Sequence, residues 1–373
     1  MRVIKPGQTI GIIGGGQLGK MLGMAAITMG YRVTILDSNK DAPAFSVAHE
    51  QIIGTLDDRA AIEKLVQIAD VVTYEFENID ATIVAELATS YKNIPQGSFP
   101  LFVSQNRQRE KNSLVEAGLT VAPFVILMDV EKELLAAITK LGYPLVIKTQ
   151  EGGYDGKGQV VVKNEADLAK VTELFDYPCV AEKFVDFTYE CSIIGVRSQD
   201  GKIKHFPMAV NTHKNNILWQ TITKENLISP VAQTKAVEML ENYLEKHNII
   251  GILTMELFIN GDEVIVNEIA PRPHNSGHYT IEGCRTSQFE QAIRAICGLP
   301  LANNDLIAPT VMYNILGQHK AALFRYLPQM SINAHLHLYG KKDYVNNRKM
   351  GHLTFINPTN EELNLFEQQV LIN

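Results

Sequence analysis

The sequence predicts an α/β protein with a parallel sheet at its N-terminus and a second α/β region behind it. Short apolar segments alternate with amphipathic segments over residues 9–95, and such alternation is typical of parallel strands covered by helices on both faces. From about residue 107 onward, some apolar segments are separated only by short turns. This second pattern indicates antiparallel hairpins among the helices.

The N-terminal elements are expected to alternate without exception. The expected strands are residues 9–14, 31–37 and 70–76, and the expected helices are residues 17–30, 57–69 and about 80–91. The stretch 94–107 is rich in Pro, Gly and Ser, and it indicates a boundary near residue 100.

The second region mixes helices with hairpins. We expect helices at residues 108–118, 165–175 and 230–247, and strands at residues 143–150, 159–163, 179–185, 190–198, 202–210, 252–259 and 264–270. The last seventy residues are expected to combine a short helix with strands such as 332–340 and 351–357.

Composition excludes several function classes. The net charge of −7 and the pI near 5.8 argue against nucleic-acid and anionic-membrane partners, which require a broad basic surface. The four cysteines are widely spaced without a C-x-x-C pair, so we expect reduced thiols. There is no signal-peptide pattern and no apolar run of about 18 residues. We therefore expect a soluble, cytoplasmic protein.

The first glycine loop has the spacing of a dinucleotide-binding turn. Gly14, Gly16 and Gly19 follow an apolar segment, and Asp37 ends the next one. The same glycines are also needed wherever a chain turns tightly between a strand and a helix. This window alone leaves both interpretations open, and the first of them predicts an NAD-dependent dehydrogenase.

The second glycine loop, residues 151–159, carries Tyr154, Asp155 and Lys157 among its glycines. Glycine-rich backbone can wrap phosphate oxygens, and a lysine adds positive charge. Lys148, at the end of the preceding apolar segment, is expected to contact phosphates as well. The alternative is a solvated hairpin tip.

Two acidic residues in neighbouring apolar segments, Glu256 and Glu268, indicate a metal site. A three-residue loop 261–263 would place them opposite each other on one face, whereas a two-residue Asn-Gly turn would point them to opposite faces. Paired carboxylates repel unless a cation lies between them, and hard oxygen ligands suit Mg²⁺. Asn267 can add a neutral oxygen. The alternative is a solvated edge strand.

Two polar segments complete the candidate site. Arg272, His274 and Asn275 directly follow the second acidic residue, which indicates an anion pocket. Near the C-terminus the basic turn 341–352 includes Lys341, Lys342, Arg348, Lys349 and His352. This turn is either a phosphate site or a solvated surface.

Taken together and in this order, the motifs resemble the ATP-grasp superfamily. The matching stretches include GIIGGGQLGKM, VTYEFEN, KTQEGGYDGKGQ, VAEKFV, MELF, NEIAPRPHNSGHYTIEGC and RKMGHLT, and they span residues 10–355. The resemblance implies a Rossmann-like pre-ATP-grasp domain at 1–105, an ATP-grasp domain at 106–298 with a flap at about 120–185, and a small C-terminal α+β domain at 299–373.

Within that superfamily the sequence resembles the branch that carboxylates 5-aminoimidazole ribonucleotide in purine biosynthesis. The resemblance implies that ATP and bicarbonate form carboxyphosphate, and that the products are N5-carboxyaminoimidazole ribonucleotide, ADP and phosphate. It also implies two Mg²⁺ ions, with Mn²⁺ as a substitute, and a homodimer without nucleic-acid or membrane partners.

The resemblance assigns each site residue a role. ATP would contact Arg107, Lys148, Gly153, Tyr154, Asp155, Gly156, Lys157, Gly158, Gln159, Glu182, Lys183, Phe184, Val185, Glu190, His213, Asn267 and Glu268. The metal ions would bind Glu256, Glu268 and Asn267. Catalysis would involve Tyr154, Asp155, Lys157, Arg272, His274 and Asn275, and the ribotide would contact Gln17, Leu18, Glu75, Lys341, Arg348 and Lys349.

Three other functions compete with this interpretation. Within the ATP-grasp enzymes, the alternative is the formate-dependent glycinamide ribonucleotide transformylase, which does not need a bicarbonate pocket around Arg272 and His274. The NAD-dependent dehydrogenase leaves the second glycine loop and the glutamate pair unexplained. A non-catalytic nucleotide-binding module is the third.

Overall fold

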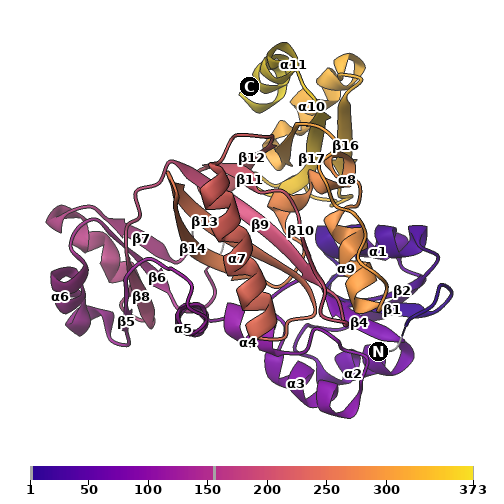
Figure 1. The fold of residues 1–373 in the computed structure, drawn as a ribbon, viewed down its shortest axis with the longest axis horizontal. Coiled ribbons are helices and arrows are strands. Elements are labelled where there is room, and N and C mark those ends of the chain that lie inside the picture. Colours follow the sequence, from indigo (N-terminus) through magenta and orange to yellow (C-terminus); the bar gives the residue numbers. More distant parts are fainter. Residues whose placement is uncertain (1–2, 154–156, 373) are drawn as a thin grey trace.

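The computed structural model describes residues 3–153 and 157–372 (Figure 1). Its N-terminal part is a parallel four-stranded sheet in the order β3-β2-β1-β4. The strands are β1 (Thr9–Ile13), β2 (Arg32–Asp37), β3 (Glu50–Ile53) and β4 (Val71–Tyr74), and the helices are α1 (Gln17–Thr28), α2 (Arg59–Ile68) and α3 (Ala81–Ser90). The predicted alternation of strands and helices is confirmed, with β3 as an addition at the sheet edge.

The two faces of this sheet belong to two different cores. Alternate residues of β1 point to opposite faces, so Ile12 packs with α1 whereas Ile13 packs with α2 and α3. The first core also includes residues of α9 (Gln288–Ile296). The N-terminal sheet is therefore joined to the rest of the protein through its α1 face.

The centre of the molecule is a nine-stranded sheet in the order β14-β13-β9-β11-β12-β15-β17-β16, with β10 paired to β9. Its strands are β9 (Tyr189–Arg197), β10 (Ile203–His205), β11 (Ala209–Lys214), β12 (Ile217–Thr223), β13 (Gly251–Asn260), β14 (Glu263–Ala270), β15 (Thr310–Leu316), β16 (Ala334–Leu338) and β17 (Lys349–Ile356). Helix α7 (Pro230–Lys246) covers one face of it (Figure 1). Strands β15 to β17, from the predicted third domain, extend this same sheet.

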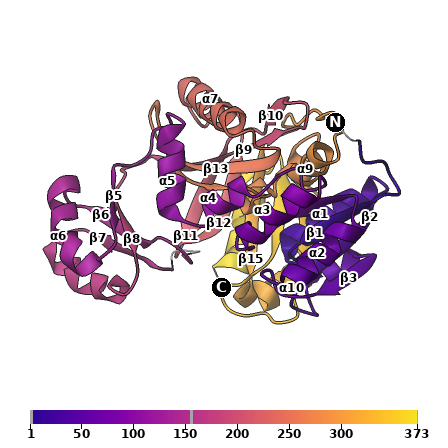
Figure 2. The same ribbon diagram turned by 90° about the horizontal axis from the view of Figure 1, so that it is seen from below.

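A second four-stranded sheet, in the order β5-β8-β6-β7, forms the flap. It consists of β5 (Phe124–Leu127), β6 (Leu145–Thr149), β7 (Gln159–Val162) and β8 (Cys179–Lys183), and α6 (Val130–Leu141) packs on it. The α-helix expected at 165–175 is a 3₁₀ helix, Glu165–Leu174. Figure 2 shows the flap standing apart from the central sheet, with α5 (Arg107–Glu116) between them.

The boundary stretch 94–107 contains a helix that was not predicted, α4 (Phe99–Ser104). Pro100 lies in its first turn, where the missing N–H of proline costs no hydrogen bond and the fixed φ favours a helix. Short helices α8 (Thr280–Gly283), α10 (Lys320–Tyr326) and α11 (Asn360–Phe366) complete the C-terminal half. No helix among the described residues is long and apolar enough to span a membrane.

Candidate active site

The first glycine loop holds one of the protein's own carboxylates. Glu75, at the end of β4, accepts hydrogen bonds from the N–H groups of Gly16 and Gly19, both at 2.6 Å. Burial raises the pKa of Glu75, although these N–H groups and Arg272 oppose the rise. A nucleotide pyrophosphate would have to displace this carboxylate, so the loop does not offer the free anion site of a dinucleotide-binding protein.

The glycines of this loop are required by close approach to Glu75. A Cβ atom at Gly16 would lie 2.6 Å from Glu75 Oε1, and one at Gly14 would lie 2.5 Å from Glu75 Cγ. The side chain of Leu18 packs in the core. A contact of Leu18 with the ribotide would therefore come from its backbone N–H in the first turn of α1, where such groups lack an intrahelical acceptor.

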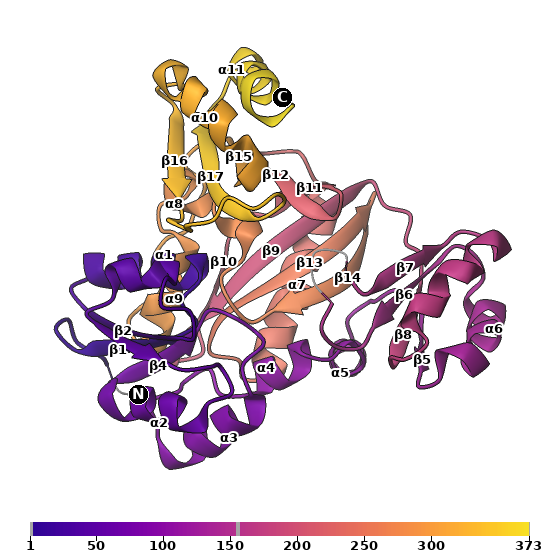
Figure 3. The ribbon, with the colours of Figure 1, turned by 180° about the vertical axis from the view of Figure 1, so that it is seen from behind.

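The C-terminal basic cluster lies beside this loop. Lys20 Nζ donates to the carbonyl oxygen of Tyr339 at 2.9 Å. Lys341 Nζ donates to the carbonyl of Lys349 at 2.8 Å, and burial together with the charge of Arg348 lowers the pKa of Lys341 to about 8. Figure 3 shows the β16–β17 hairpin rising next to α1. The fold thus brings Lys341, with Arg348 and Lys349 close to it, near Glu75 and the first turns of α1. The role of these residues as a phosphate site stays a prediction.

The residues predicted to contact ATP include members of a buried cluster of charged groups on the flap and α5. Glu182 of β8 forms ion pairs with Lys148 of β6 (3.2 Å) and with Lys111 of α5 (3.0 Å). Burial acts to raise the pKa of Glu182, but the two lysines outweigh it and lower the pKa. Beyond Glu182, Lys183 and Phe184 are exposed, and Val185 is half-buried.

The second glycine loop, residues 151–159, is anchored at both of its described ends. The N–H of Arg107 donates to the carbonyl of Gln150 (2.9 Å), and the N–H of Thr149 donates to the carbonyl of Gly158 (2.8 Å). Lys148 pairs with Gln159 in the β6–β7 ladder. Gly153, Lys157 and Gly158 therefore lie near Arg107 and Lys148, whereas Tyr154, Asp155 and Gly156 lie outside the described residues.

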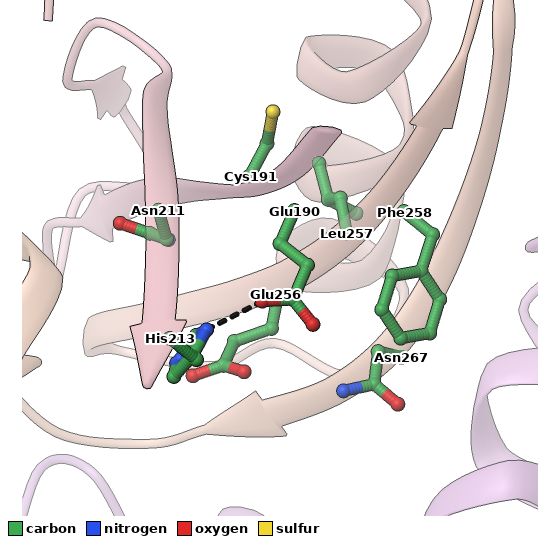
Figure 4. Close-up of a pocket in the computed structure, with 8 residues that line it drawn as sticks. All are labelled: Glu190, Cys191, Asn211, His213, Glu256, Leu257, Phe258 and Asn267. Atoms are coloured by element: carbon green, nitrogen blue, oxygen red, sulfur yellow. Dashed lines mark hydrogen bonds and ion pairs between the residues drawn. The ribbon is translucent and has the colours of Figure 1, made fainter. Parts of the chain in front are cut away.

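A small pocket on the central sheet brings together the predicted nucleotide and metal residues (Figure 4). It is lined by Glu190, Cys191, Asn211, His213, Glu256, Leu257, Phe258 and Asn267. His213 Nδ1 bonds to the Glu190 carboxylate. Burial acts to lower the pKa of His213, but Glu190 outweighs it and raises the pKa, so the pair favours an imidazolium.

The two candidate metal carboxylates lie opposite each other, for a reason that differs from the predicted one. The hairpin loop has two residues, because Asn260 pairs with Glu263. A β-bulge then shifts the register between Glu256 and Leu257, so that Glu256 pairs with Glu268. The predicted opposition is confirmed, whereas the three-residue loop expected to produce it is wrong.

Both carboxylates contact positive or proton-donating groups. Glu256 Oε1 lies 3.0 Å from His274 Nε2, and Glu268 Oε2 lies 3.2 Å from Arg107 Nη1. Burial acts to raise the pKa of Glu256, but the hydrogen bond and charge of His274 outweigh it and lower the pKa to about 2. Glu256 is therefore ionised at neutral pH.

The donor set fits a hard cation that is shared with a nucleotide. Glu256 and Glu268 supply carboxylates, and Asn267 supplies an amide oxygen that accepts from Lys148 at 3.4 Å. Within residues 3–153 and 157–372 there is no cluster of three or more His, Cys, Asp and Glu residues suited to a metal. Mg²⁺ commonly binds through one or two carboxylates and completes its shell with phosphates and water.

The segment after β14 is tightly held. Arg272 forms a two-point ion pair with Glu77, in which Nη2 donates to Oε1 at 2.9 Å and Nε donates to Oε2. The amide of Asn275 exchanges two hydrogen bonds with Asn314, at 2.9 and 2.8 Å. His274 and Arg272 therefore remain next to the carboxylate pair, while the Asn275 side chain is engaged by β15.

Several residues of the site were not predicted. They are Lys20, Glu77, Glu110, Lys111 and Asn314. Each acts through a partner far away in the chain, so its own sequence window carries no motif. The one local signal is the second glutamate of VTYEFEN, which follows a buried strand as the first one does.

Family models match three successive parts of the chain. They are the ribonucleotide synthetase pre-ATP-grasp domain over residues 7–105, the ATP-grasp domain over 112–289 and the phosphoribosylaminoimidazole carboxylase C-terminal domain over 310–365.

Relatives that match nearly the whole chain indicate the same family. The N5-carboxyaminoimidazole ribonucleotide synthase of Bacillus subtilis is 46% identical over 363 residues, which cover 97% of this chain and 94% of that protein. A crystal structure of an ADP complex of the synthetase PurK has a TM-score of 0.94 and 44% identity, with 99% of both chains covered. The Aspergillus clavatus enzyme, in complex with ADP and 5-aminoimidazole ribonucleotide, has a TM-score of 0.88 and 31% identity, with 97% of both chains covered. With these matches over nearly its whole length, the chain belongs to the N5-carboxyaminoimidazole ribonucleotide synthase family of ATP-grasp ligases.

Proposed function

We propose that this chain catalyses the ATP-dependent carboxylation of 5-aminoimidazole ribonucleotide by bicarbonate. The observation that carries the proposal is the contact of His274 with Glu256 of the opposed pair Glu256 and Glu268, with Arg272 close enough to lower the pKa of Glu256. A cation-binding pair suits nucleotide phosphates, and an adjacent arginine and imidazole suit a small anion. The family and its substrate complexes support the same reaction.

The chemistry needs two successive transfers. A bicarbonate oxygen attacks the γ-phosphorus of ATP and breaks the bond to the β-phosphate oxygen, which gives carboxyphosphate and ADP. The exocyclic amine of the ribotide then attacks the carboxyl carbon, either directly or after collapse to CO₂. Phosphate leaves, and the amine loses a proton. We assign the acceptance of that proton to Asp155 of the second glycine loop.

The protein's task in the first transfer is to hold anions close together. Arg107, Lys148 and His213 supply positive charge around the phosphates. Arg272 and His274 orient bicarbonate, with Glu77 fixing the guanidinium. Positioning and charge neutralisation account for most catalysis in phosphoryl transfer.

We propose that Glu256, Glu268 and Asn267 hold Mg²⁺, with Mn²⁺ as a substitute. Bound there, the ion would neutralise the charge that develops on the transferred phosphoryl group. The remaining substrate, the ribotide, would bind between α1 and the basic turn, where Lys341 lies close to Arg348 and Lys349 and to the Glu75 carboxylate that holds the first glycine loop.

The direct test measures ADP release with purified protein, Mg²⁺, ATP and 5-aminoimidazole ribonucleotide, with and without bicarbonate. We expect ADP release only when both substrates are present. ADP release that instead requires formate and glycinamide ribonucleotide would favour the transformylase alternative.

The predicted cytoplasmic location and homodimer remain proposals. Sedimentation velocity tests the dimer, because one chain has a mass of 41.5 kDa and a dimer would have twice that mass.

A further inference from the structure

The bulge at Asn267 lies on β14, an edge strand of the central sheet, where the ladder changes register. Backbone groups at an edge and at a bulge lack partners within the sheet. Two of them bind side chains of α5. The carbonyl of Asn267 accepts a hydrogen bond from Lys111 Nζ at 2.9 Å, and the N–H of Ile269 donates to Glu110 Oε1 at 2.7 Å.

These two side chains are buried against β14. Glu110 is 3% exposed and Lys111 is 1% exposed. They bind the residues immediately before and after Glu268, while Arg107, one turn earlier on α5, binds the Glu268 carboxylate itself. Helix α5 therefore contacts three successive residues of β14, with Glu268 in the middle.

The bulge decides which side chain lies opposite Glu256. Leu257 pairs with Val266, and if this register continued without a bulge, Glu256 would lie opposite Asn267. Glu268 would then point to the other face of the sheet, because successive side chains of a strand alternate. Glu256 and Glu268 therefore lie opposite each other only while Asn267 remains bulged out of the β13–β14 ladder.

We propose that Glu110 and Lys111 are positioning residues that hold the β14 bulge and thereby keep Glu268 opposite Glu256. The consequence for metal binding rests on the proposed function, in which these two glutamates bind the cation. The expected effect on the β14 backbone, faster hydrogen exchange at Ile269, does not depend on the proposed function.

The experiment compares three single variants with the unmodified protein. Glu110→Leu removes the acceptor for the Ile269 N–H, whereas Glu110→Gln keeps an oxygen of similar position. Ser113→Ala is the matched control, because it removes another buried hydrogen bond of α5, the 2.8 Å contact with the Tyr243 hydroxyl on α7, without touching β14.

Two measurements are made on each variant. The first is hydrogen exchange of the 264–270 backbone in the absence of any ligand. The second is Mn²⁺ binding in the presence of ADP, followed by electron paramagnetic resonance. In Glu110→Leu we expect exchange at Ile269 to rise, and Mn²⁺ affinity to fall, by about tenfold each. Glu110→Gln and Ser113→Ala should stay within about twofold of the unmodified protein.

Unchanged exchange at Ile269 in Glu110→Leu overturns the proposal, because the bulge would then hold without Glu110. Raised exchange with unchanged Mn²⁺ affinity overturns the link from the bulge to the cation, and with it the metal assignment of the proposed function. An equal loss of affinity in Ser113→Ala also overturns the proposal, because the effect would then be general destabilisation. If Glu110→Leu does not fold, Lys111→Met removes the other contact. Because this variant also breaks the 3.0 Å ion pair with Glu182, it is judged by hydrogen exchange of the 264–270 backbone alone. Failure of the carboxylation assay would leave the exchange result unaffected, so the two proposals fail separately.

Discussion

At the scale of single residues, Glu75 occupies the place in the first glycine loop that a bound anion takes in nucleotide-binding proteins. Its two oxygens cap the N-terminal end of α1 from a neighbouring strand, since Gly16 itself has no side chain to do so. The loop is therefore tied to β4, and its geometry depends on this carboxylate.

Gly16→Val tests this dependence. The added Cβ would lie 2.6 Å from Glu75 Oε1, so the carboxylate and the start of α1 must shift beside the predicted ribotide site. We expect KM for 5-aminoimidazole ribonucleotide to rise by about tenfold or more, as a loss of roughly 1.4 kcal/mol in binding implies. ADP affinity, measured by calorimetry, should change little, and equal damage to both would show that the loop serves the nucleotide.

The buried carboxyl of Glu110 predicts a pH effect on stability. Burial and the nearby charge of Glu268 raise its pKa to about 8. A raised carboxyl pKa stabilises the folded state below the unfolded pKa of about 4, and this stabilisation is lost as the pH rises through 8. Between pH 5 and pH 9 the unmodified protein should lose on the order of 3 kcal/mol of unfolding free energy relative to Glu110→Gln.

Urea unfolding of both proteins across this pH range checks the prediction. The difference between the two proteins isolates Glu110, because all other titrating groups are shared. A difference that is constant with pH would contradict the assignment of the raised pKa to this residue.

The motifs could be predicted because their residue types and spacing indicate a chemical role without knowledge of the tertiary structure. Lys148 lies at the end of an apolar strand, Arg272 follows one and Glu256 interrupts one, and polar groups in such places indicate a site. Their partners could not be predicted. Lys111 reaches Asn267 across 156 residues, and Arg272 reaches Glu77 across 195, so these pairings exist only after the tertiary fold has formed.

At the scale of secondary structure elements, most apolar segments were predicted, whereas α6, β12 and several local irregularities were not. The bulge in β14 is one example, because the hydrophobic pattern is the same with or without an extra residue. The 3₁₀ helix Glu165–Leu174 is another, since its pattern resembles that of an α-helix. Strand β3 is short and mostly exposed, so it lacks the apolar alternation that marks a strand.

The packing of α7 on the central sheet gives a prediction at this scale. A Cβ at Gly195 of β9 would lie 2.7 Å from Leu240 Cδ2 and 2.9 Å from Leu244 Cδ1 of α7. Gly195→Val should therefore cost about 1–3 kcal/mol of unfolding free energy through overpacking. Thermal denaturation measures this loss.

Leu240→Ala provides the matched test of the same contact. It opens space at the contact, so the double variant should be more stable than the sum of the two single losses predicts. Simple additivity would show that Gly195 and α7 do not contact each other closely in solution.

At the scale of the whole molecule, the predicted ribotide site is built from the two ends of the chain. Lys20 and Tyr339 are 319 residues apart in sequence, yet they share a hydrogen bond, and the β16–β17 hairpin lies beside α1 (Figures 1 and 3). The resemblance to a family predicted that the two ends of the chain contribute to one site, whereas no local sequence pattern could predict it. The contact also means that the N-terminal and C-terminal regions must be correctly packed for the ribotide to bind.

Lys20→Met tests this arrangement. The variant removes the 2.9 Å hydrogen bond to Tyr339 and a positive charge near the basic turn. KM for 5-aminoimidazole ribonucleotide should rise by roughly 10- to 160-fold, since a hydrogen bond to a charged group contributes about 1.5–3 kcal/mol. ADP affinity should be unchanged, and an unaltered KM would contradict the placement of the ribotide between these regions.

We propose that this protein couples ATP cleavage at the Glu256–Glu268 pair to bicarbonate and an aminoimidazole ribotide. The most direct measurement is ADP release in the presence and absence of bicarbonate, with Glu268→Gln in parallel. We predict ADP release that requires both substrates and falls at least about 100-fold in the variant, as expected when a phosphoryl-transfer ligand is lost. ADP release that is indifferent to bicarbonate, or unchanged in Glu268→Gln, would contradict the account.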